Sequence, residues 1–359
     1  MKKALFITYN NIRDIYSGGS QCSLRNYQML SNSYDTDVYT AENLKIQKLL
    51  SVFLLYFPPI TRKDKKNILS LISIKEYELI FVDSSLFGKI IKAINKGKKR
   101  NIVSFFHNVE YDYISVRFGR KIIKYPYLLL AHLNEKWALD HSSIKITVNH
   151  RDEKRIAEIY GQKVDSIIPI TFDKGKTIPT TKYDGIKHTD YFLFIGSLNN
   201  SNLTAIEWFI DNVVPEVKKI KLLIVGKDFE TKRNKLEKTN IHVIGTTDNL
   251  EYFYENALAV ISPIRMGGGM KVKIAEALMY GKTIFGTTEA FEGYDTSNEN
   301  STIVCNTAAE YIEKINHFLE RNNTKIIFNT ESRRLFEDKY SFENAVSAFE
   351  EVIKVKDLK

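Results

Sequence analysis

Cysteines and long apolar runs are both scarce in this chain of 359 residues. Its two cysteines, Cys22 and Cys305, have neither the spacing of a disulfide framework nor that of a zinc site, which fits a reducing compartment. No run reaches the roughly 18 apolar residues that a membrane-spanning helix needs. The apolar run near the N-terminus is too short for the core of a signal peptide. We therefore expect a cytoplasmic protein.

Metal-ligand spacing is missing as well. Apart from His107, the chain has six histidines, and none of them stands at the spacing of a ligand set. Because a protein metal site normally draws several ligands from such a pattern, no metal site is predicted.

Net charge is distributed unevenly. Residues 1–176 contain 29 Lys and Arg against 17 Asp and Glu, whereas the remainder contains 23 against 26. A basic first half beside a nearly neutral second half indicates that one domain meets an anionic partner. Nucleic acid and an anionic membrane leaflet both carry that charge. Nucleic acid ranks last because no nucleic-acid-binding module is recognisable.

One basic stretch is interleaved with aromatic and aliphatic residues. In "FGRKIIKYPYLLL" (118–130), Arg120, Lys121 and Lys124 stand beside tyrosines and leucines. Anionic headgroups attract such cations, and the acyl boundary accepts the apolar side chains. The segment predicts peripheral contact with the inner face of a membrane, with ordinary helix packing as the alternative. Residues 42–66 provide a second apolar face, suited to an acceptor or a partner.

Short apolar strands alternate with amphipathic helices along the whole chain. The predicted strands are 4–8, 37–40, 79–83, 101–107, 144–149, 166–170, 191–197, 221–226, 241–245, 258–264, 283–287 and 301–305. The predicted helices are 20–32, 42–56, 84–97, 110–142 (broken), 151–161, 203–218, 229–238, 270–280, 307–321 and 341–356. This alternation indicates βαβ units and parallel sheets.

Two doubly wound α/β domains account for this order. The polar segment 176–190 lacks periodicity and is predicted to be a linker between a domain over 1–175 and a second over 191–340. Residues 341–359 are predicted to form a helix that packs back toward the first domain. Ligands gather at the carboxyl ends of strands in such folds, so we expect the two domains to face each other across a ligand-binding cleft.

The stretch "SPIRMGGGMKVKIAEALMYGKTIFGT" (262–287) breaks a local rule. Three glycines, Gly267 to Gly269, join a strand to a helix, and Lys271 and Lys273 stand where that helix begins. A helix N-terminus favours acidic side chains, not cations. A bound diphosphate would reverse the preference, because backbone N–H groups and both lysines would surround it. The alternative is a solvent-exposed glycine turn with two free lysines.

Glu276 interrupts the apolar surface of the same helix. It shares a helical stripe with Lys273 and Tyr280. A buried carboxylate needs a partner, and two are open: an ion pair with Lys273, or the hydroxyl groups of a bound sugar.

Together, "PIRMGGGMKVKIAEALMYGKTIFGT" and "EAFEGYD" resemble the nucleotide-sugar site of GT-B glycosyltransferases, particularly the retaining enzymes of family 4, in a glycine-rich variant of the motif. The resemblance implies two facing Rossmann-like domains (GT-B), of which the N-terminal one binds the acceptor and the C-terminal one the donor. It also implies chemistry without a bound metal or cofactor, with the nucleotide sugar, a UDP-sugar first, as co-substrate.

The resemblance also implies roles for single residues. Gly268, Gly269, Lys271 and Lys273 would hold the diphosphate, and Glu276 the ribose hydroxyl groups. Met270 is expected to belong to the same donor-binding site. Two features depart from the family pattern. Gly268 stands where the family has a first glutamate that contacts the donor sugar. After "FIGSL", Asn199 and Asn202 stand where many members have Arg and Lys, and Arg265 is expected to help compensate.

The first half offers a matching set. Gly18 and Gly19 are predicted to form the first strand-to-helix turn, with Ser20 as the helix N-cap. His107 ends an apolar strand, the position where cleft residues emerge. A lone histidine is more often structural, but the resemblance implies that His107 contacts the donor sugar and that the glycine pair lines the cleft.

The sequence therefore predicts a retaining glycosyltransferase of the hexosyltransferase type, which transfers a sugar to a glycan or polyprenyl-linked glycan hydroxyl in the synthesis of a bacterial surface polysaccharide. Two other classes stay open. A nucleotide-sugar 2-epimerase shares the fold but needs more cleft carboxylates and histidines. A non-catalytic GT-B subunit would fit the missing first glutamate. The donor sugar, the acceptor, the linkage and the oligomeric state are not specified by the sequence.

Overall fold

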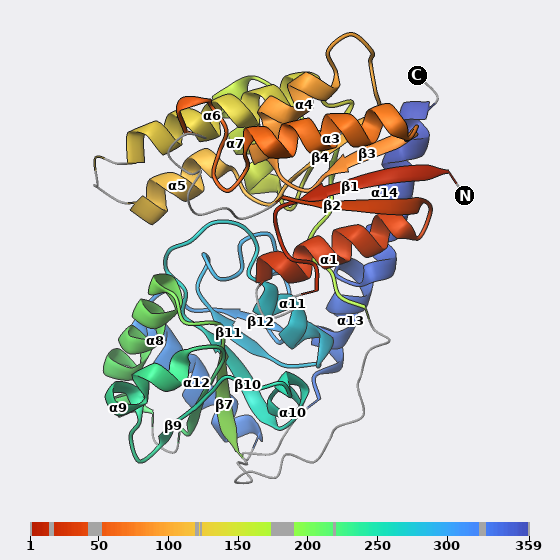
Figure 1. Ribbon diagram of the computed structural model, residues 1–359. Coiled ribbons are helices and arrows are strands. Elements are labelled where there is room, and N and C mark those ends of the chain that lie inside the picture. The colour runs from red at the N-terminus through yellow and green to blue at the C-terminus, as the bar shows by residue number, and fades with distance from the viewer. Residues whose placement is uncertain are drawn as a thin grey trace. The chain divides into compact units, whose positions relative to one another are not determined.

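The computed structural model describes residues 2–13, 18–41, 52–118, 122, 124–173, 190–217, 220–322 and 328–357. The chain forms two compact units (Figure 1). Unit 1 comprises Met1–Ile170 together with Phe342–Lys359, and unit 2 comprises Thr171–Ser341. The predicted linker over 176–190 lies outside the described residues, except for Asp190.

Unit 1 is built on a parallel six-stranded sheet with the order β2-β1-β3-β4-β5-β6. Its strands are β1 Lys3–Thr8, β2 Asp35–Thr40, β3 Leu79–Val82, β4 Ile102–Phe106, β5 Ile144–Thr147 and β6 Ser166–Ile167. The strand β1 pairs with both β2 and β3, so the direction of strand addition reverses at β1. Such a switch point opens a crevice at the carboxyl ends of the strands.

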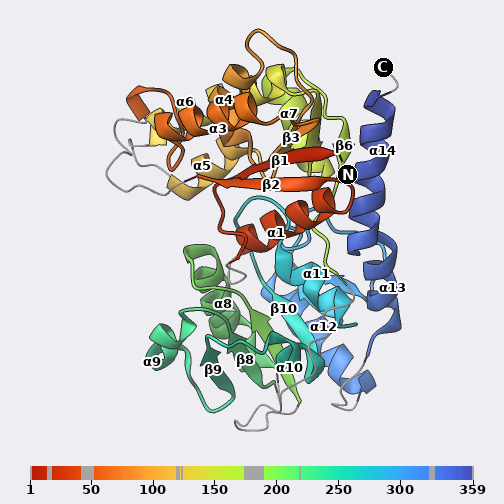
Figure 2. The same cartoon turned by 45° about the vertical axis from the view of Figure 1, so that its right-hand side comes forward.

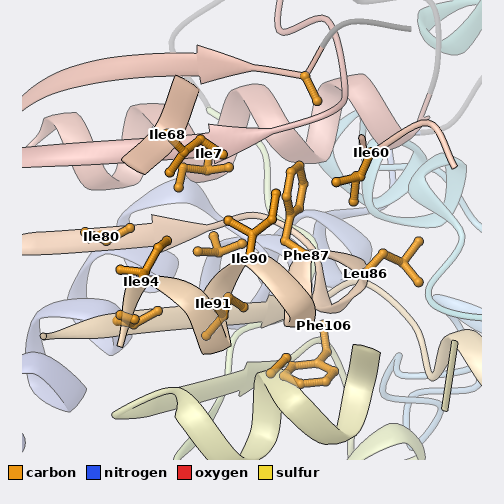
Figure 3. Close-up of a cluster of buried hydrophobic side chains, with 14 of the residues drawn as sticks. Ile7, Ile60, Ile68, Ile80, Leu86, Phe87, Ile90, Ile91, Ile94 and Phe106 are labelled. Carbon is orange, nitrogen blue, oxygen red and sulfur yellow. The ribbon is translucent and has the colours of Figure 1, made fainter. Parts of the chain in front are cut away.

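The helices of unit 1 are α1 Gly18–Ser31, α3 Arg62–Ile74, η2 Ser85–Phe87, α4 Gly88–Ile94, α5 Glu110–Phe118, α6 Lys124–His141, α7 His150–Tyr160 and α14 Phe342–Asp357. One core cluster joins α3, α4 and α6 to the sheet. Figure 3 shows Ile90, Ile91 and Ile94 of α4 among side chains of the strands. Burial of these aliphatic side chains supplies the main driving force for folding.

Aromatic rings fill the other face of this sheet. Phe81 stacks on Phe6 and on Phe105, with ring centroids 5.4 and 6.2 Å apart. Phe349 of α14 meets Phe81 edge to face at 5.9 Å. The helix α14 lies beside α1 (Figure 2), and Lys356 forms an ion pair with Asp165 at 2.8 Å. The last helix is thus part of the core of unit 1.

Unit 2 contains a second parallel six-stranded sheet, with the order β12-β11-β10-β7-β8-β9. Its strands are β7 Tyr191–Ile195, β8 Leu222–Val225, β9 Ile241–Gly245, β10 Ala257–Ser262, β11 Ile284–Gly286 and β12 Thr302–Val304. The strand β7 pairs with β8 and with β10. The switch point therefore lies between β7 and β10, and residues that follow these strands share one edge of the sheet.

The helices of unit 2 are α8 Asn200–Asn212, η3 Val214–Glu216, η4 Phe229–Lys232, α9 Arg233–Leu236, α10 Leu250–Glu255, α11 Val272–Met279, α12 Ala308–Asn322 and α13 Thr330–Lys339. Phe209 of α8 and Tyr311 of α12 pack edge to face at 5.4 Å over the sheet. On α11, Ile274, Ala275, Ala277 and Leu278 are fully buried, as expected from the apolar pattern of that helix.

The two parallel sheets confirm the predicted α/β class, and every predicted strand is present with ends that differ by a few residues. The broken helix predicted over 110–142 is α5 and α6. Most of the predicted helix 42–56 lies outside the described residues. Helices α3, α10 and α13 were not predicted. Among the described helices, none combines the length and the apolar character needed to cross a bilayer.

Candidate functional site

The glycine turn that follows β10 forms the centre of the candidate site in unit 2. Gly267 has φ +150° and Gly269 has φ +64°, backbone conformations that side chains with a Cβ rarely adopt. The helix α11 begins directly afterwards, with Lys271 as its N-cap and without a side-chain cap hydrogen bond. The first N–H groups of α11 therefore lack the side-chain acceptor that usually satisfies them.

Lys271 does not extend into solvent as a free cation. Its Nζ donates to the carbonyl of Gly269 at 2.7 Å and lies 3.0 Å from Glu289 Oε1. Glu289 follows β11, the strand beside β10. The carboxylate neutralises much of the charge of Lys271, so this lysine binds the turn and Glu289 in the structure described here.

Lys273 lies in a different environment. Its side chain is buried, and its Nζ donates to Asn202 Oδ1 at 2.9 Å. The ammonium also lies 4.6 Å from the centroid of the Phe194 ring, a favourable cation–π distance. The ion pair with Glu276, one of the two alternatives, is not formed: within the described residues the partner of Lys273 is a neutral amide.

Burial and, to a smaller extent, the nearby charge of Lys271 lower the pKa of Lys273 to about 7, although Glu276 acts in the opposite direction. The desolvation of an ammonium in an apolar site favours its neutral form. An anion placed beside Lys273 would favour the charged form again. The site is therefore electrostatically prepared for a negative ligand.

Strand-end glycines allow the backbone and these side chains to approach one another. Gly196 follows β7 with φ +151°, and a Cβ there would lie 2.8 Å from Asn202 Nδ2 and 2.9 Å from Lys273 Nζ. Gly226 follows β8, and its Cβ would lie 2.1 Å from the carbonyl oxygen of Gly196. A side chain at position 196 would occupy the space beside the ammonium, and one at position 226 would collide with the backbone of Gly196.

Glu276 accepts a hydrogen bond from the hydroxyl of Tyr254 at 2.9 Å. Burial raises the pKa of Glu276 to about 7, against the lowering effects of Tyr254 and Lys273. Tyr280 stacks on Tyr254 with centroids 5.0 Å apart. The carboxylate thus keeps one fixed donor and has further acceptor capacity for other hydroxyl groups.

Two other predicted donor-site residues have different surroundings. The Arg265 guanidinium lies 3.6 Å from the centroid of the Trp208 ring and donates to the carbonyl of Asn306 at 3.1 Å. It shares neither partner with the two lysines. Met270 is buried, with 6% of its surface exposed, so its side chain packs in the protein interior.

A second polar cluster lies at the switch point of unit 1. Asp83 directly follows β3 and is completely buried. Its carboxylate accepts hydrogen bonds from Thr8 at 3.1 Å, from Asn26 at 2.6 Å and from Ser23. His107, which directly follows β4, places Nε2 3.0 Å from Asp83 Oδ1.

The Asp83 contact determines the charge of His107. Burial alone would lower the pKa of the imidazole, but the charge of Asp83 and its hydrogen bond outweigh this effect and raise the pKa to about 10. The Cys22 thiol acts in the same direction. His107 is therefore an imidazolium at neutral pH, a fixed positive charge at the carboxyl end of β4.

The prediction for Gly18, Gly19 and Ser20 needs a correction. The helix α1 begins at Gly18, so both glycines form its first turn and Ser20 lies inside the helix, not at the N-cap. Glycines accept helical backbone angles, and nothing in a sequence requires them to stay outside the helix. A Cβ on Gly19 would lie 3.7 Å from Asn10 Oδ1, and Asn10 donates to Ser23 at 2.8 Å. The glycine pair thus borders the cluster around Asp83.

The basic and aromatic segment 118–130 is only partly described, and Arg120 and Lys121 lie outside the described residues. Large apolar side chains near the start of α6 are exposed, namely Ile122 at 83%, Tyr125 at 62% and Leu129 at 57%. Lys124 Nζ lies 5.6 Å from the centroid of the Tyr125 ring. Of the other candidate surface, residues 42–51 are outside the described part, and Phe53 is largely exposed.

Metal ligands do not gather at either cluster. Across the described ranges, no three His, Cys, Asp or Glu side chains are grouped as a metal ion would require.

Comparison with known proteins assigns a type to unit 2. Residues 189–321 match the family model described as "Glycosyl transferases group 1". The matched range contains the glycine turn, both lysines and Glu276. This part of unit 2 is therefore similar to the glycosyltransferase group 1 family.

Proteins that are similar over most of the chain have low sequence identity to it. An uncharacterized 44.6 kDa protein in the cps region of Klebsiella pneumoniae is 25% identical over 290 residues, which cover 75% of this chain and 72% of that protein. Sucrose-phosphate synthase from Thermosynechococcus elongatus is 12% identical, with a TM-score of 0.76 over 99% of this chain and 98% of that one. Anabaena HepE, solved in complex with UDP-glucose, is 12% identical, with a TM-score of 0.70 over 99% of this chain and all of that one. The similarity to the two solved structures shows the GT-B fold.

Proposed function

We propose that this chain is a retaining glycosyltransferase of the hexosyltransferase type that uses a nucleotide-sugar donor, with a UDP-sugar as the first candidate. The observation that carries the proposal is Lys273: a buried ammonium at the β7/β10 switch point, beside an uncapped helix N-terminus, with a neutral partner. The match of residues 189–321 to a glycosyltransferase model supports it, as does the fold shared with a protein solved with UDP-glucose.

The donor diphosphate would lie against the turn of Gly268 and Gly269. Backbone N–H groups in the first turn of α11 and the ammonium of Lys273 would donate to its oxygens. Lys271 would join them by exchanging its contact with Glu289 for the ligand. Because charge develops on the diphosphate as the glycosidic bond breaks, donors fixed beforehand stabilise the transition state more than the ground state.

Glu276 would accept hydrogen bonds from the ribose hydroxyl groups, with Tyr254 holding the carboxylate in place. The contact of His107 with the donor sugar and the place of Gly18 and Gly19 beside it stay predictions. So does the help of Arg265 in binding the diphosphate. We propose a metal-independent reaction because an ammonium group and a helix N-terminus supply positive charge to the leaving group, and activity insensitive to a chelator is the expected result.

Retention of the anomeric configuration would follow from attack on the face that the leaving group vacates, with the departing phosphate oxygen taking the acceptor proton. In this scheme the protein positions both substrates and stabilises charge. The acceptor would be a glycan or a polyprenyl-linked glycan of a bacterial surface polysaccharide. The name of the Klebsiella relative, which places it in a cps region, is consistent with this proposal.

Membrane contact through the start of α6 is part of the same proposal. Exposed Ile122, Tyr125 and Leu129 would enter the headgroup boundary, with Lys124 at the anionic surface. Co-sedimentation with vesicles of anionic lipid tests it: Leu129→Ser should reduce binding several-fold, and equal binding of the variant would contradict the proposal.

A donor panel tests the proposed activity. Wild type, Lys273→Ala and Glu276→Gln would be incubated with UDP-, GDP- and dTDP-sugars, and release of the nucleoside diphosphate would be followed with and without acceptor glycans. We expect wild type to consume the sugars of one nucleotide class. The rate of nucleoside diphosphate release should be about tenfold to a hundredfold lower in Lys273→Ala, which corresponds to the loss of a hydrogen bond to a charged group. If the wild-type protein is folded but consumes no donor, the result would favour a non-catalytic subunit. Conversion of the donor to its epimer would favour an epimerase.

A further inference from the structure

The Lys273 ammonium has more hydrogen-bond donors than it uses within the described residues. An ammonium carries three N–H donors, and Lys273 makes one hydrogen bond within the described residues, to Asn202. Its side chain is 9% exposed, so bulk water has little access to the remaining donors. A buried cation with spare donors is a costly arrangement without a ligand.

Asn202 is itself fixed from two sides. Its backbone N–H donates to Asn199 Oδ1 at 2.8 Å, which caps the start of α8. Its Nδ2 donates to the carbonyl of Ser197 at 2.7 Å. The first bond fixes the backbone of Asn202, and the second fixes its side chain: rotating the amide would break the bond to Ser197, so Oδ1 stays directed at Lys273.

The charge of this partner distinguishes Lys273 from its neighbour. Lys271 lies beside the carboxylate of Glu289 at 3.0 Å, whereas Asn202 supplies only a dipole. A carboxylate at position 202 would form an ion pair with Lys273 and cancel the charge that attracts an anion. A neutral acceptor holds the ammonium in one place and leaves its charge available.

We propose that Asn202 is the positioning residue for Lys273: its amide oxygen aims the ammonium at the phosphate oxygens of the donor while leaving the positive charge unpaired. The inference rests on the proposed function. It adds that the N-terminal turn of α8, which follows β7, and the N-terminal turn of α11, which follows β10, act together on one nucleoside diphosphate.

The groups that surround the Lys273 ammonium determine the pH at which it loses its proton. Lys271 and Glu276 are the charged side chains that influence it, while Phe194 of β7 and Asn202 of α8 are neutral. Above about pH 7 the phosphates of UDP remain ionised, so the affinity for UDP should fall with rising pH as Lys273 loses its proton. An added carboxylate at position 202 would keep Lys273 protonated to higher pH and would also repel the diphosphate.

The test compares Asn202→Asp with Asn212→Asp. Asn212 is exposed at the other end of the same helix and donates to the carbonyl of Trp208, so the control makes the same charge change away from the turn. Binding of UDP and of uridine to the full chain would be measured by calorimetry from pH 7 to 9. We expect Asn202→Asp to lower the affinity for UDP at pH 7 by about tenfold or more and to leave the affinity for uridine unchanged. The pH at which the UDP affinity begins to fall should be higher than in wild type. The control should behave as wild type.

A weakened affinity with an unchanged pH profile would overturn the inference, since a purely structural role of Asn202 would give that result. Titration of Lys273 by NMR, with isotope-labelled lysine, provides a readout without nucleotide. If wild type binds no nucleoside diphosphate but Asn202→Asp still raises the Lys273 pKa, the proposed function fails while the contact that positions Lys273 stands. An equal Lys273 pKa in both proteins would overturn the positioning role itself.

Discussion

At the scale of residues, Lys271 and Lys273 are two positions apart and carry the same charge, yet their partners give them different properties. Lys271 is neutralised by Glu289, and Lys273 is held by an amide. The distinction lies in one side chain that follows β11 and one from α8, which are 18 and 71 positions away in the sequence. The residues next to the two lysines do not reveal these partners, so the local sequence predicts the same role for both.

Removal of the Glu289 charge should therefore release Lys271. In Glu289→Gln we expect UDP to bind about twofold to fivefold more tightly, the range of a partly exposed ion pair. The measurement is titration of UDP at low and high salt, and the gain should shrink at high salt. Weaker binding of UDP in this variant would show that Glu289 supports the site in a way the ion pair does not explain.

Asp83 should control the protonation of His107. In wild type the raised pKa of His107, about 10 against an ordinary 6.5, stabilises the fold most below pH 6.5, and this stabilisation is lost as pH rises through 10. Asp83→Asn removes the charge, and burial then lowers the His107 pKa below its ordinary value. NMR titration of the His107 ring checks this, with exposed His150 as the internal reference. An unchanged His107 pKa in Asp83→Asn would contradict the account.

Some of these residues were accessible from the sequence and others were not. His107 and the glycine turn stood out because each follows an apolar strand. Asp83 gave the same signal, as the last residue of "LIFVD", and was read only as part of a strand. Asn202 was noted as a departure from the family pattern, but its contact with Lys273 depends on the pairing of β7 with β10, which no local pattern specifies.

At the scale of elements, two helical glycines show how packing, not conformation, limits substitution. A Cβ on Gly88, at the start of α4, would lie 1.8 Å from the carbonyl oxygen of Asn134 in α6, whereas on Gly19 its nearest neighbour would be 3.7 Å away. The close crossing of α4 and α6 therefore depends on the absence of a side chain at position 88.

Alanine at these two positions should have opposite effects on stability. We expect Gly88→Ala to lower the free energy of unfolding by more than about 3 kcal/mol, since backbone would have to move. Gly19→Ala should be neutral or stabilising by up to about 1 kcal/mol. Urea unfolding of both variants provides the measurement, and a tolerated Gly88→Ala would mean that the two helices are farther apart than described.

Helix boundaries were the weakest part of the sequence-based prediction at this scale. The strands were found because their apolar runs are short and bounded by glycine or polar residues. The helix α3 was missed because Lys and Arg dominate its first turns and its apolar residues are confined to its second half, although Thr61 and Asp64 form a capping box. The helix α10 has six residues, too few for a helical period to be recognised.

At the scale of the whole molecule, the two units have separate cores and should respond separately to mutation. Phe349 of α14 contacts Phe81 in the core of unit 1. Phe349→Ala should lower the stability of unit 1 by about 3–5 kcal/mol and leave the UDP affinity of unit 2 unchanged. Calorimetric unfolding with and without UDP would resolve the two effects. Equal destabilisation of the UDP-dependent transition would show that the units unfold together.

The central claim is that Lys273 binds the diphosphate of a nucleotide-sugar donor, and calorimetric titration of UDP into wild type and Lys273→Met tests it most directly. Exposed Lys221 of unit 2 provides the control Lys221→Met, with the same loss of charge. The account predicts that Lys273→Met lowers the affinity for UDP by about tenfold to a hundredfold. Its affinity for uridine, and the UDP affinity of the control, should stay at wild-type values. Equal binding of UDP by both variants would contradict it.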